Sequence, residues 1–164
     1  MRSRAGKPVS TADKSEARLA VIFLGLGSNL GDRQQNIVRA IEELKAAGIE
    51  IEKVSALMET DPVGGPPQDK YLNAVLKAST IFLPKELLRE IQTIEKKLGR
   101  IRNTINGPRP IDVDILLYDR LEMQSPELTI PHPRMFDRDF VMVPLKQIEP
   151  AYREEFLYEN NSNR

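Results

Sequence analysis

The sequence predicts an α+β fold, a ferredoxin-like sandwich of the order β-α-β-β-α-β with a C-terminal extension. In this fold we expect the helices to cover one face of an antiparallel sheet. Three observations lead to the prediction. Short apolar runs rich in β-branched residues alternate with two segments of helical periodicity. Glycine, proline and capping residues mark the ends of these segments. A hydrophobic content of 40% over 164 residues suits one domain with a sizeable core.

The first strand and the first helix follow each other near the start of the domain. Residues 20–26 form a short apolar run that reads as a buried strand. Asp32 and Gln35 then have the spacing of a helical capping box, and Gly48 stands where a helix would end. The apolar residues between these caps recur at helical intervals: Ile37, Ile41 and Leu44.

A segment rich in glycine and proline, residues 61–67, separates the next two predicted strands. The strand before it starts at Ile49 and runs towards Thr60, and the strand after it covers residues 71–81. Proline and paired glycines suit neither a helix nor a strand ladder. We therefore expect an antiparallel pair of strands with a mobile connection.

The second helix is predicted to begin at Pro84, because proline suits the first helical turn, and to end at Gly99. After a basic loop, residues 111–118 read as a fourth strand. A short strand over residues 128–130 and a tail with several prolines from Pro131 complete the domain. The apolar stripe of the second helix is Leu87, Ile91, Ile94 and Leu98.

Composition excludes several classes of protein. The chain has no cysteine, so disulfides, thiol catalysis and cysteine-bound metals are absent. No apolar run approaches the length of a membrane span, and the net charge is zero, which favours neither nucleic acid nor a membrane surface. We expect a cytoplasmic monomer with one domain over residues 20–158. Residues 1–19 are expected to form a disordered tail, with a weak organellar presequence as the alternative, and residues 159–164 to fray.

Asp112 and Asp114 are the main candidates for chemistry. Residues two apart in a strand share a face, so both carboxylates point the same way while Val113 points to the other side. Two like charges on one face of an apolar strand repel each other, and a divalent cation would relieve the repulsion. Magnesium takes one or two carboxylates and completes its coordination with water and phosphate oxygens. The alternative is an exposed strand face with two solvated acids.

Arginines surround this acidic pair in the sequence. Arg109 lies in a rigid Gly-Pro-Arg-Pro turn just before the acids, and Arg100 and Arg102 follow the predicted end of the second helix. Their guanidinium groups suit bidentate binding of phosphate. The alternative for Arg100 and Arg102 is a solvated helix terminus that favours cations. Cationic side chains beside paired carboxylates are what a metal–polyphosphate site requires.

Five segments, in order, carry a resemblance to a known family. The stretch NGPRPIDVDILL, residues 106–117, resembles the signature of 6-hydroxymethyl-7,8-dihydropterin pyrophosphokinases. The other segments are GSNLGD at residues 27–32, YLN at residues 71–73, the series Gln92, Glu95, Arg100 and Arg102, and IPHPRMFDRDFVMVPL at residues 130–145. Asn106 stands where some members carry tryptophan, and Asp61 stands where proline is often found.

The resemblance implies a transfer of the pyrophosphoryl group of ATP to the hydroxymethyl group of a reduced pterin, in folate biosynthesis, with AMP as the other product. Two Mg²⁺ ions would be bound by Asp112 and Asp114, and Arg100 and Arg109 would compensate phosphate charge during transfer. Glu95 would have a structural role. The implied nucleotide contacts are Leu88, Gln92, Arg102, Ile115, Thr129, His132 and Arg138. The implied pterin contacts are Thr60, Val63, Tyr71, Asn73 and Phe140, with Tyr71 and Phe140 stacking on the ring.

Other functions remain possible on the residues alone. A Rossmann-type dinucleotide site is excluded, because Leu30 stands where the fingerprint needs its third glycine. A non-catalytic ferredoxin-like module that binds RNA or a metabolite would share the fold, but RNA-binding sheets need exposed aromatics and only 5% of residues are aromatic. The runner-up is another Mg²⁺-dependent transferase that uses ATP.

Overall fold

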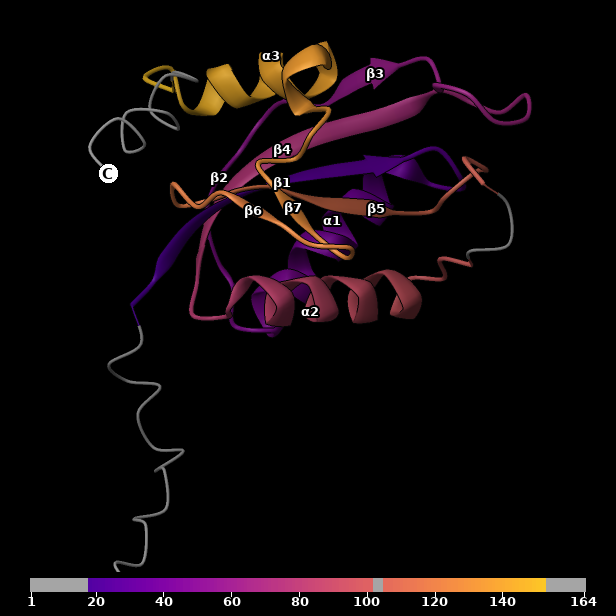
Figure 1. Ribbon diagram of the computed structural model, residues 1–164. Coiled ribbons are helices and arrows are strands. Elements are labelled where there is room, and N and C mark those ends of the chain that lie inside the picture. Colours follow the sequence, from indigo (N-terminus) through magenta and orange to yellow (C-terminus); the bar gives the residue numbers. More distant parts are fainter. Residues whose placement is uncertain (1–17, 102–104, 153–164) are drawn as a thin grey trace, which may run out of the picture.

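A central antiparallel sheet with helices on both faces organises the chain (Figure 1). The structure is a computed structural model, and it describes residues 18–101 and 105–152. The expected tails, residues 1–19 and 159–164, lie outside this part except for Arg18 and Leu19, and Arg102 also lies outside it. Among the helices of the described residues, none has the length and apolar character that crossing a bilayer requires.

The five-stranded sheet confirms the ferredoxin-like prediction. Its strands are β1 (Ala20–Ser28), β2 (Glu50–Val54), β3 (Met58–Thr60), β4 (Tyr71–Thr80) and β5 (Asp112–Tyr118). The order across the sheet is β2-β4-β1-β5, β3 also pairs with β4, and every pairing is antiparallel. Strand β1 therefore lies between β4 and β5, which are the third and fourth strands of the predicted fold, as the expected topology requires.

Helices α1 (Arg33–Ala46) and α2 (Pro84–Lys97) cover one face, as expected. The Asp32 side chain accepts a hydrogen bond from the Gln35 backbone amide at 3.0 Å, which satisfies one of the free N–H groups at the start of α1. At the other end Gly48 has a φ of +90°, a conformation that glycine adopts without strain. Both helix boundaries were readable from local residues.

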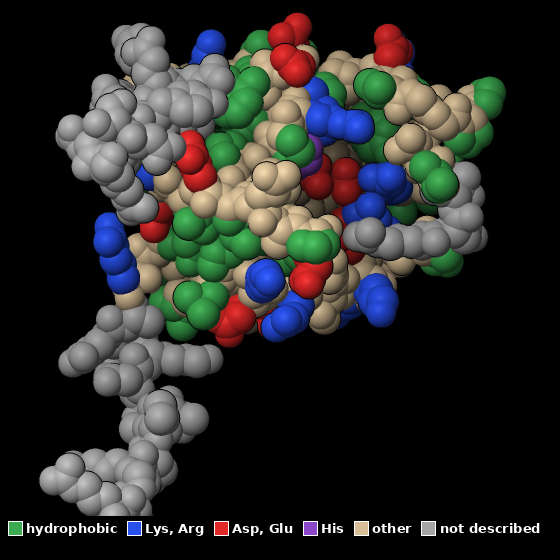
Figure 2. Space-filling model, in the orientation of Figure 1, with side chains coloured by type: hydrophobic (Ala, Val, Ile, Leu, Met, Phe, Trp, Pro, Cys, Tyr) green, Lys and Arg blue, Asp and Glu red, His purple; other side chains and the backbone are tan. Residues whose placement is uncertain are grey.

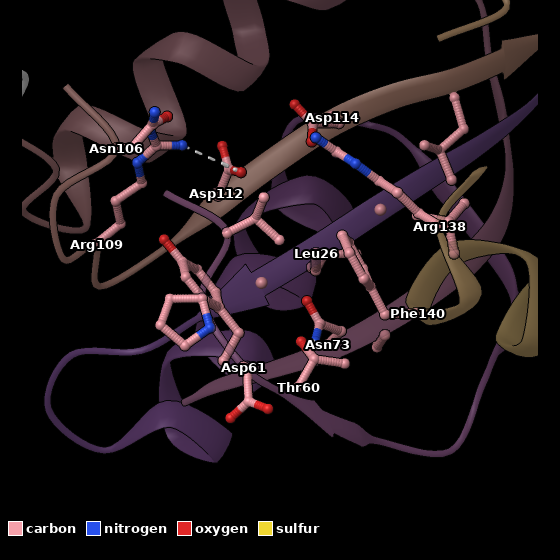
Figure 3. Close-up of a pocket in the computed structure, with 18 of the residues that line it drawn as sticks. Leu26, Thr60, Asp61, Asn73, Asn106, Arg109, Asp112, Asp114, Arg138 and Phe140 are labelled. Carbon is pink, nitrogen blue, oxygen red and sulfur yellow. Dashed lines mark hydrogen bonds and ion pairs between the residues drawn. The ribbon is translucent and has the colours of Figure 1, made fainter. Parts of the chain in front are cut away.

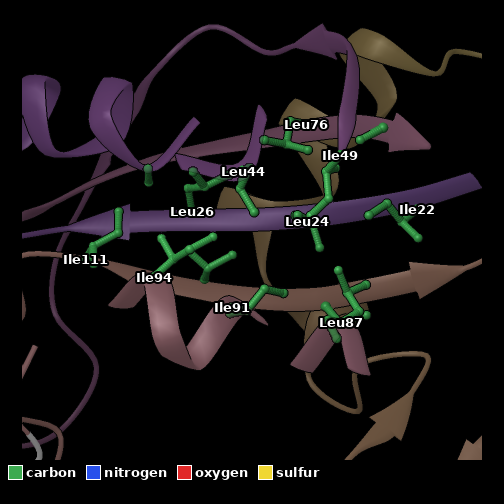
Figure 4. Close-up of a cluster of buried hydrophobic side chains, with 14 of the residues drawn as sticks. Ile22, Leu24, Leu26, Leu44, Ile49, Leu76, Leu87, Ile91, Ile94 and Ile111 are labelled. Atoms are coloured by element: carbon green, nitrogen blue, oxygen red, sulfur yellow. The ribbon is translucent and has the colours of Figure 1, made fainter. Parts of the chain in front are cut away.

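The main core lies between this face and the two helices (Figure 4). Alternate residues of β1, among them Leu24 and Leu26, point into it, and so do Val113 and Ile115 of β5. The residues that are almost fully buried there include Ile22, Leu44, Ile49, Leu76, Leu87, Ile91 and Ile111. Because these residues use one side of each strand, the intervening residues face the opposite side of the sheet.

That opposite face carries a helix that the sequence reading missed. Instead of an irregular tail, residues after Pro131 form a 3₁₀ turn, η2 (Met135–Asp137), and the helix α3 (Asp139–Ile148). Pro144 lies inside α3, where proline removes a backbone hydrogen bond, and this hid the helical pattern. Burial decides the outcome, since α3 closes a second core made of Phe23, Val75, Leu116, Leu117, Met135, Val141, Leu145 and Ile148. The two predicted helices share one face as expected, but the C-terminal extension adds a helix on the other face.

Two strand predictions also need correction. The strand expected from Ile49 towards Thr60 is interrupted at Ser55, where the Val75 amide donates to Ser55 Oγ at 2.9 Å instead of to a strand carbonyl. The Ala56 amide donates to Gln147 Oε1 of α3 at 3.1 Å. The expected short strand at 128–130 is β7 (Thr129–Ile130), and it pairs with an unpredicted partner, β6 (Met123–Gln124).

Candidate active site

A pocket opens on the sheet face that α3 partly covers, and its lining residues come from several strands, two loops and the start of α3 (Figure 3). Strands β1, β4 and β5 form its floor, and α3 forms one wall. Residues 61–70, here called the Gly/Pro loop, and residues 99–101 and 105–109, the described part of the basic loop, contribute the opposite wall. In the space-filling view, acidic side chains lie recessed in a hollow that basic side chains flank (Figure 2).

Two glycines of β1 leave room for the pocket. Gly27 is paired with Asn73 on one side and with Asp112 on the other, and Gly25 is paired with Asp114. A Cβ atom at Gly27 would lie 3.3 Å from Asn73 Oδ1 and 3.4 Å from Tyr71 Cδ1. Because β1 has no side chains at these two positions, the polar groups of its neighbours converge over a bare strand. The sequence reading did not assign this role; glycines at alternate positions opposite the acids were the available signal.

Asp112 and Asp114 project from the same side of β5 into the pocket, as predicted (Figure 3). Burial, together with the charges of Asp112 and Glu95, raises the pKa of Asp114 to about 7, against the opposing effect of Arg138. A carboxyl group with so high a pKa holds its charge poorly unless a cation lies nearby. The pair is therefore electrostatically incomplete by itself.

The two arginines expected to bind phosphate both contact Asp112. Arg100 Nη1 lies 2.8 Å from Asp112 Oδ1, and Arg109 Nη1 lies 3.4 Å from Asp112 Oδ2. Arg100 also pairs with Glu95, a buried carboxylate that accepts a hydrogen bond from the Val113 amide at 3.2 Å. Glu95 thus anchors Arg100 at the mouth of the acidic pair, and burial raises the pKa of the Glu95 carboxyl.

The other end of the pocket is suited to a flat polar ligand. Tyr71 of β4 and Phe140 of α3 line it, and the Arg138 guanidinium lies 5.3 Å from the centre of the Phe140 ring. The side-chain amide of Asn73 donates to Met58 O at 3.1 Å and to Thr60 Oγ1 at 2.7 Å. Both amide hydrogens are thereby used, so Asn73 offers a ligand its oxygen, while the Thr60 hydroxyl is left to donate.

The residues expected to bind the nucleotide are only partly brought together. Arg138 lines the pocket, whereas Leu88, Gln92, Ile115, Thr129 and His132 lie outside its lining. The side chain of Ile115 is buried in the helix-side core, so a contact with a nucleotide would use its backbone. His132 lies after β7, its Nδ1 accepts from the Arg134 amide at 3.2 Å, and burial lowers its pKa. Arg102 is outside the described residues.

Asn29 and Gln68 also belong to the site, although the sequence reading did not single them out. The buried side chain of Asn29 accepts from the Arg109 amide at 2.8 Å and donates to Gln68 Oε1 at 2.7 Å. Asn29 therefore ties the end of β1 to both loops. Its place within the GSNLGD segment was the only signal in the sequence.

Within residues 18–101 and 105–152, no group of three or more acidic or histidine side chains could hold a metal by itself. A cation at Asp112 and Asp114 would have to complete its coordination with other oxygens. Mg²⁺ behaves in this way, keeping waters and taking substrate phosphate oxygens. The donor set therefore fits Mg²⁺ bound together with a phosphorylated ligand.

Comparison with known proteins gives one consistent family. The family model described as 7,8-dihydro-6-hydroxymethylpterin-pyrophosphokinase (HPPK) matches residues 23–150. A 2-amino-4-hydroxy-6-hydroxymethyldihydropteridine pyrophosphokinase of Aquifex aeolicus is 47% identical over 80% of this chain and 82% of the relative. The enzyme of that name from Bacillus subtilis is 43% identical over 78% of this chain and 77% of its own length.

A longer relative matches over part of its length, and a solved structure shares the fold. A folate synthesis bifunctional protein of Pisum sativum is 41% identical over 77% of this chain, which spans only 25% of that relative. The crystal structure of Plasmodium falciparum HPPK-DHPS A437G with SDX-DHP superposes with a TM-score of 0.67 at 15% identity. The match covers 85% of this chain and 44% of that one. Because the identity is low, the superposition supports the fold alone.

Proposed function

Because the chain belongs to the 7,8-dihydro-6-hydroxymethylpterin-pyrophosphokinase family, we propose that this pocket is where its reaction takes place. The protein is an ATP-dependent diphosphotransferase of folate biosynthesis. It transfers the pyrophosphoryl group of ATP to 6-hydroxymethyl-7,8-dihydropterin and leaves AMP. One observation carries the assignment of the site: the paired acids share a single pocket with the aromatic and amide groups suited to a pterin.

The pterin would bind between Tyr71 and Phe140, where a flat heterocycle gains from stacking on two rings. Asn73 would accept a hydrogen bond from an N–H of the pterin edge, and the Thr60 hydroxyl would donate to a neighbouring acceptor. Backbone groups near Val63 would make the remaining hydrogen bonds to the edge of the pterin ring. This arrangement explains why both amide hydrogens of Asn73 are held by protein atoms: they set the direction of its oxygen.

The phosphate chain would lie across Asp112, Asp114 and the nearby arginines. Asp112 and Asp114 would hold the two Mg²⁺ ions, whose positive charge would neutralise that of the phosphate oxygens. Arg100 and Arg109, which both contact Asp112, would compensate the charge of the phosphates. Gln92, Arg102, His132 and Arg138 remain candidates for nucleotide contacts, together with Leu88, Ile115 and Thr129.

In the transfer, the pterin hydroxymethyl oxygen forms a bond to the β-phosphorus of ATP. The bond between that phosphorus and the oxygen bridging to the α-phosphate breaks, and AMP carries the electron pair away. The hydroxyl proton passes to solvent water during the attack. The protein's residues act by holding the two substrates in line and by balancing the charge on the phosphate oxygens.

Incubation with ATP, Mg²⁺ and 6-hydroxymethyl-7,8-dihydropterin tests the proposal directly. We expect AMP and the pterin diphosphate in equal amounts. ADP or an adenylylated product would instead identify another ATP-using transferase, and binding without turnover would identify a ligand-binding module. The monomeric state and the cytoplasmic location stay predictions, and light scattering on the purified chain tests the first.

A further inference from the structure

The Gly/Pro loop and the basic loop meet at one backbone group, the carbonyl of Asn106. Gln68 Nε2 donates to this carbonyl oxygen at 2.8 Å. Gly65 packs against the same group, so closely that an added Cβ atom would lie 2.3 Å from the oxygen and 3.0 Å from its carbon. A residue with a side chain at position 65 could not occupy this place unless one of the loops moved.

Both residues at the contact have left-handed backbones. The φ angle is +75° at Gly65 and +52° at Asn106. Glycine adopts this conformation freely, and asparagine is among the few other residues that tolerate it. The Asn106 carbonyl faces the Gly/Pro loop, where Gln68 donates to it. Asn106 therefore suits this junction at the position where tryptophan stands in some resembling sequences.

The junction is connected to the pocket on both sides. Gln68, which holds the Asn106 carbonyl, accepts from Asn29, and Asn29 in turn holds the Arg109 amide. Asp61, Pro62, Val63 and Gln68 line the pocket from one loop, and Asn106 and Arg109 line it from the other. The closeness of the loops at Gly65 consequently sets how far the pterin end of the pocket lies from Arg109.

We propose that Gly65 is a positioning residue for the transfer reaction. Its missing side chain seats the Gly/Pro loop on the Asn106 carbonyl and holds the backbone at residues 61–63 in register with Arg109 before substrates bind. The identity of the ligand in this pocket rests on the function proposed above. The contact between the two loops is independent of that function. Holding the two reacting groups at a set separation favours transfer, because attack requires close and aligned atoms.

The chain contains a matched control for this proposal. Gly64 also has a left-handed backbone, with a φ of +71°, but an added Cβ there would meet only Asn106 Nδ2 at 3.6 Å, an ordinary contact. Both variants place an alanine in a left-handed backbone. Pro66 restricts the backbone further at position 65 alone, so Gln68→Ala, which keeps both glycines, is measured beside them. Only Gly65→Ala forces the loops apart.

The absence of cysteine allows a measurement that does not depend on activity. Val63 and Ile105 are 77% and 88% exposed, so spin labels on Val63→Cys and Ile105→Cys report the distance between the loops in the ligand-free chain. We expect Gly65→Ala to lengthen and broaden the distance distribution and Gly64→Ala to leave it like the parent. An unchanged distribution in Gly65→Ala would overturn the proposal.

Kinetics, without the spin labels, give the second arm. Gly65→Ala should raise the KM for the pterin by roughly tenfold or more and lower kcat, with a smaller effect on the KM for ATP, because the pterin end of the pocket is displaced. Equal effects of both alanine variants would mean that backbone strain is the cause, and the proposal would be wrong.

If the spin labels show the expected short distance between the loops in the parent chain but the chain does not turn over the pterin, the proposed function is wrong and the proposed contact between the loops is still supported. If Gly65→Ala does not fold, Gln68→Ala decides: a broadened distance supports the contact, and an unchanged one refutes it.

Discussion

At the scale of single residues, the proposed site assigns the central role in the chemistry to Asp114. Its burial beside Asp112 leaves a carboxylate that needs a cation. Asp114→Asn keeps the size of the side chain but removes the charge. We expect kcat with ATP, Mg²⁺ and the pterin to fall by about a thousandfold or more, because charge neutralisation at the phosphates is lost. A steady-state assay of AMP release measures this.

Glu50→Gln provides the control, since it removes one negative charge from an exposed position on the edge strand β2. Its rate should match the parent. Circular dichroism should show that Asp114→Asn remains folded. Normal turnover of the folded Asp114→Asn protein would remove Asp114 from the metal site.

Asn73 makes a separate prediction at the pterin end. Asn73→Ala removes the oxygen offered to the pterin and leaves Met58 O and Thr60 Oγ1 without their donors. A lost partner for a buried polar group costs about 1–3 kcal/mol, so pterin affinity should fall roughly tenfold to a hundredfold. Calorimetric titration measures it, with ATP affinity unchanged as the internal control. A parallel loss of ATP affinity would argue against a pterin-specific role.

At the scale of elements, helix α3 links stability to the site. Leu145 is fully buried in the second core, while Phe140 and Arg138, at the start of the same helix, reach the pocket. Leu145→Ala should reduce the free energy of unfolding by about 2–5 kcal/mol through the cavity it leaves. It should also weaken pterin binding, because the helix that carries Phe140 is held less firmly. Urea denaturation and pterin titration measure the two effects.

Val143 lies on the same helix but is 57% exposed, so Val143→Ala tests the helix without the core. The unfolding free energy of that variant should change by about 0.5 kcal/mol or less. If Leu145→Ala lost stability yet bound the pterin as tightly as the parent, α3 would serve the core alone.

For the whole molecule, Asp114 predicts a pH dependence of stability. An unfolded aspartate has a pKa of about 3.9. In the folded chain burial raises the pKa of Asp114 to about 7, so between these values the folded state holds a proton that the unfolded state has lost. The stability linked to this proton is present at low pH and is lost as the pH rises through 7. Without metal, the parent should lose stability relative to Asp114→Asn between pH 5 and pH 8, by at most about 3 kcal/mol.

Thermal unfolding of both proteins at the two pH values measures this difference. Subtracting the result for Asp114→Asn from that for the parent cancels the titrating groups that the two proteins share. Mg²⁺ with ATP should then raise the Tm of the parent more at pH 8 than at pH 5, because binding requires the ionised carboxylate. An equal response at both pH values would show that Asp114 does not titrate in this range.

Much of the fold was readable from the sequence, because the signals are local. Asp32, Gly48, Pro84 and Gly99 mark helix ends through hydrogen bonds and backbone angles within a few residues of each. The period of two along β5 placed both acids on one face, as the structure confirms. The assignments of individual residues to the nucleotide stay predictions.

Other features escaped the sequence reading, because they depend on contacts between distant segments. Pro144 argues locally against a helix, yet α3 forms because its apolar stripe buries against Val75 and Leu116. Ser55 interrupts a strand because its hydroxyl takes the place of a ladder carbonyl for Val75. Neither outcome can be derived from neighbours in the chain.

The sequence alone determined the order of the β-α-β-β-α-β elements, the acidic pair and the resemblance that led to the reaction, since periodicity, capping and motif spacing are properties of short stretches. Only the tertiary structure decided which groups meet: the bare glycines of β1 under the acids, the second helical layer that brings Phe140, and the contact between Gly65 and Asn106. The physical reason is that close packing joins residues far apart in the chain, and which of them touch depends on how all the layers fit together.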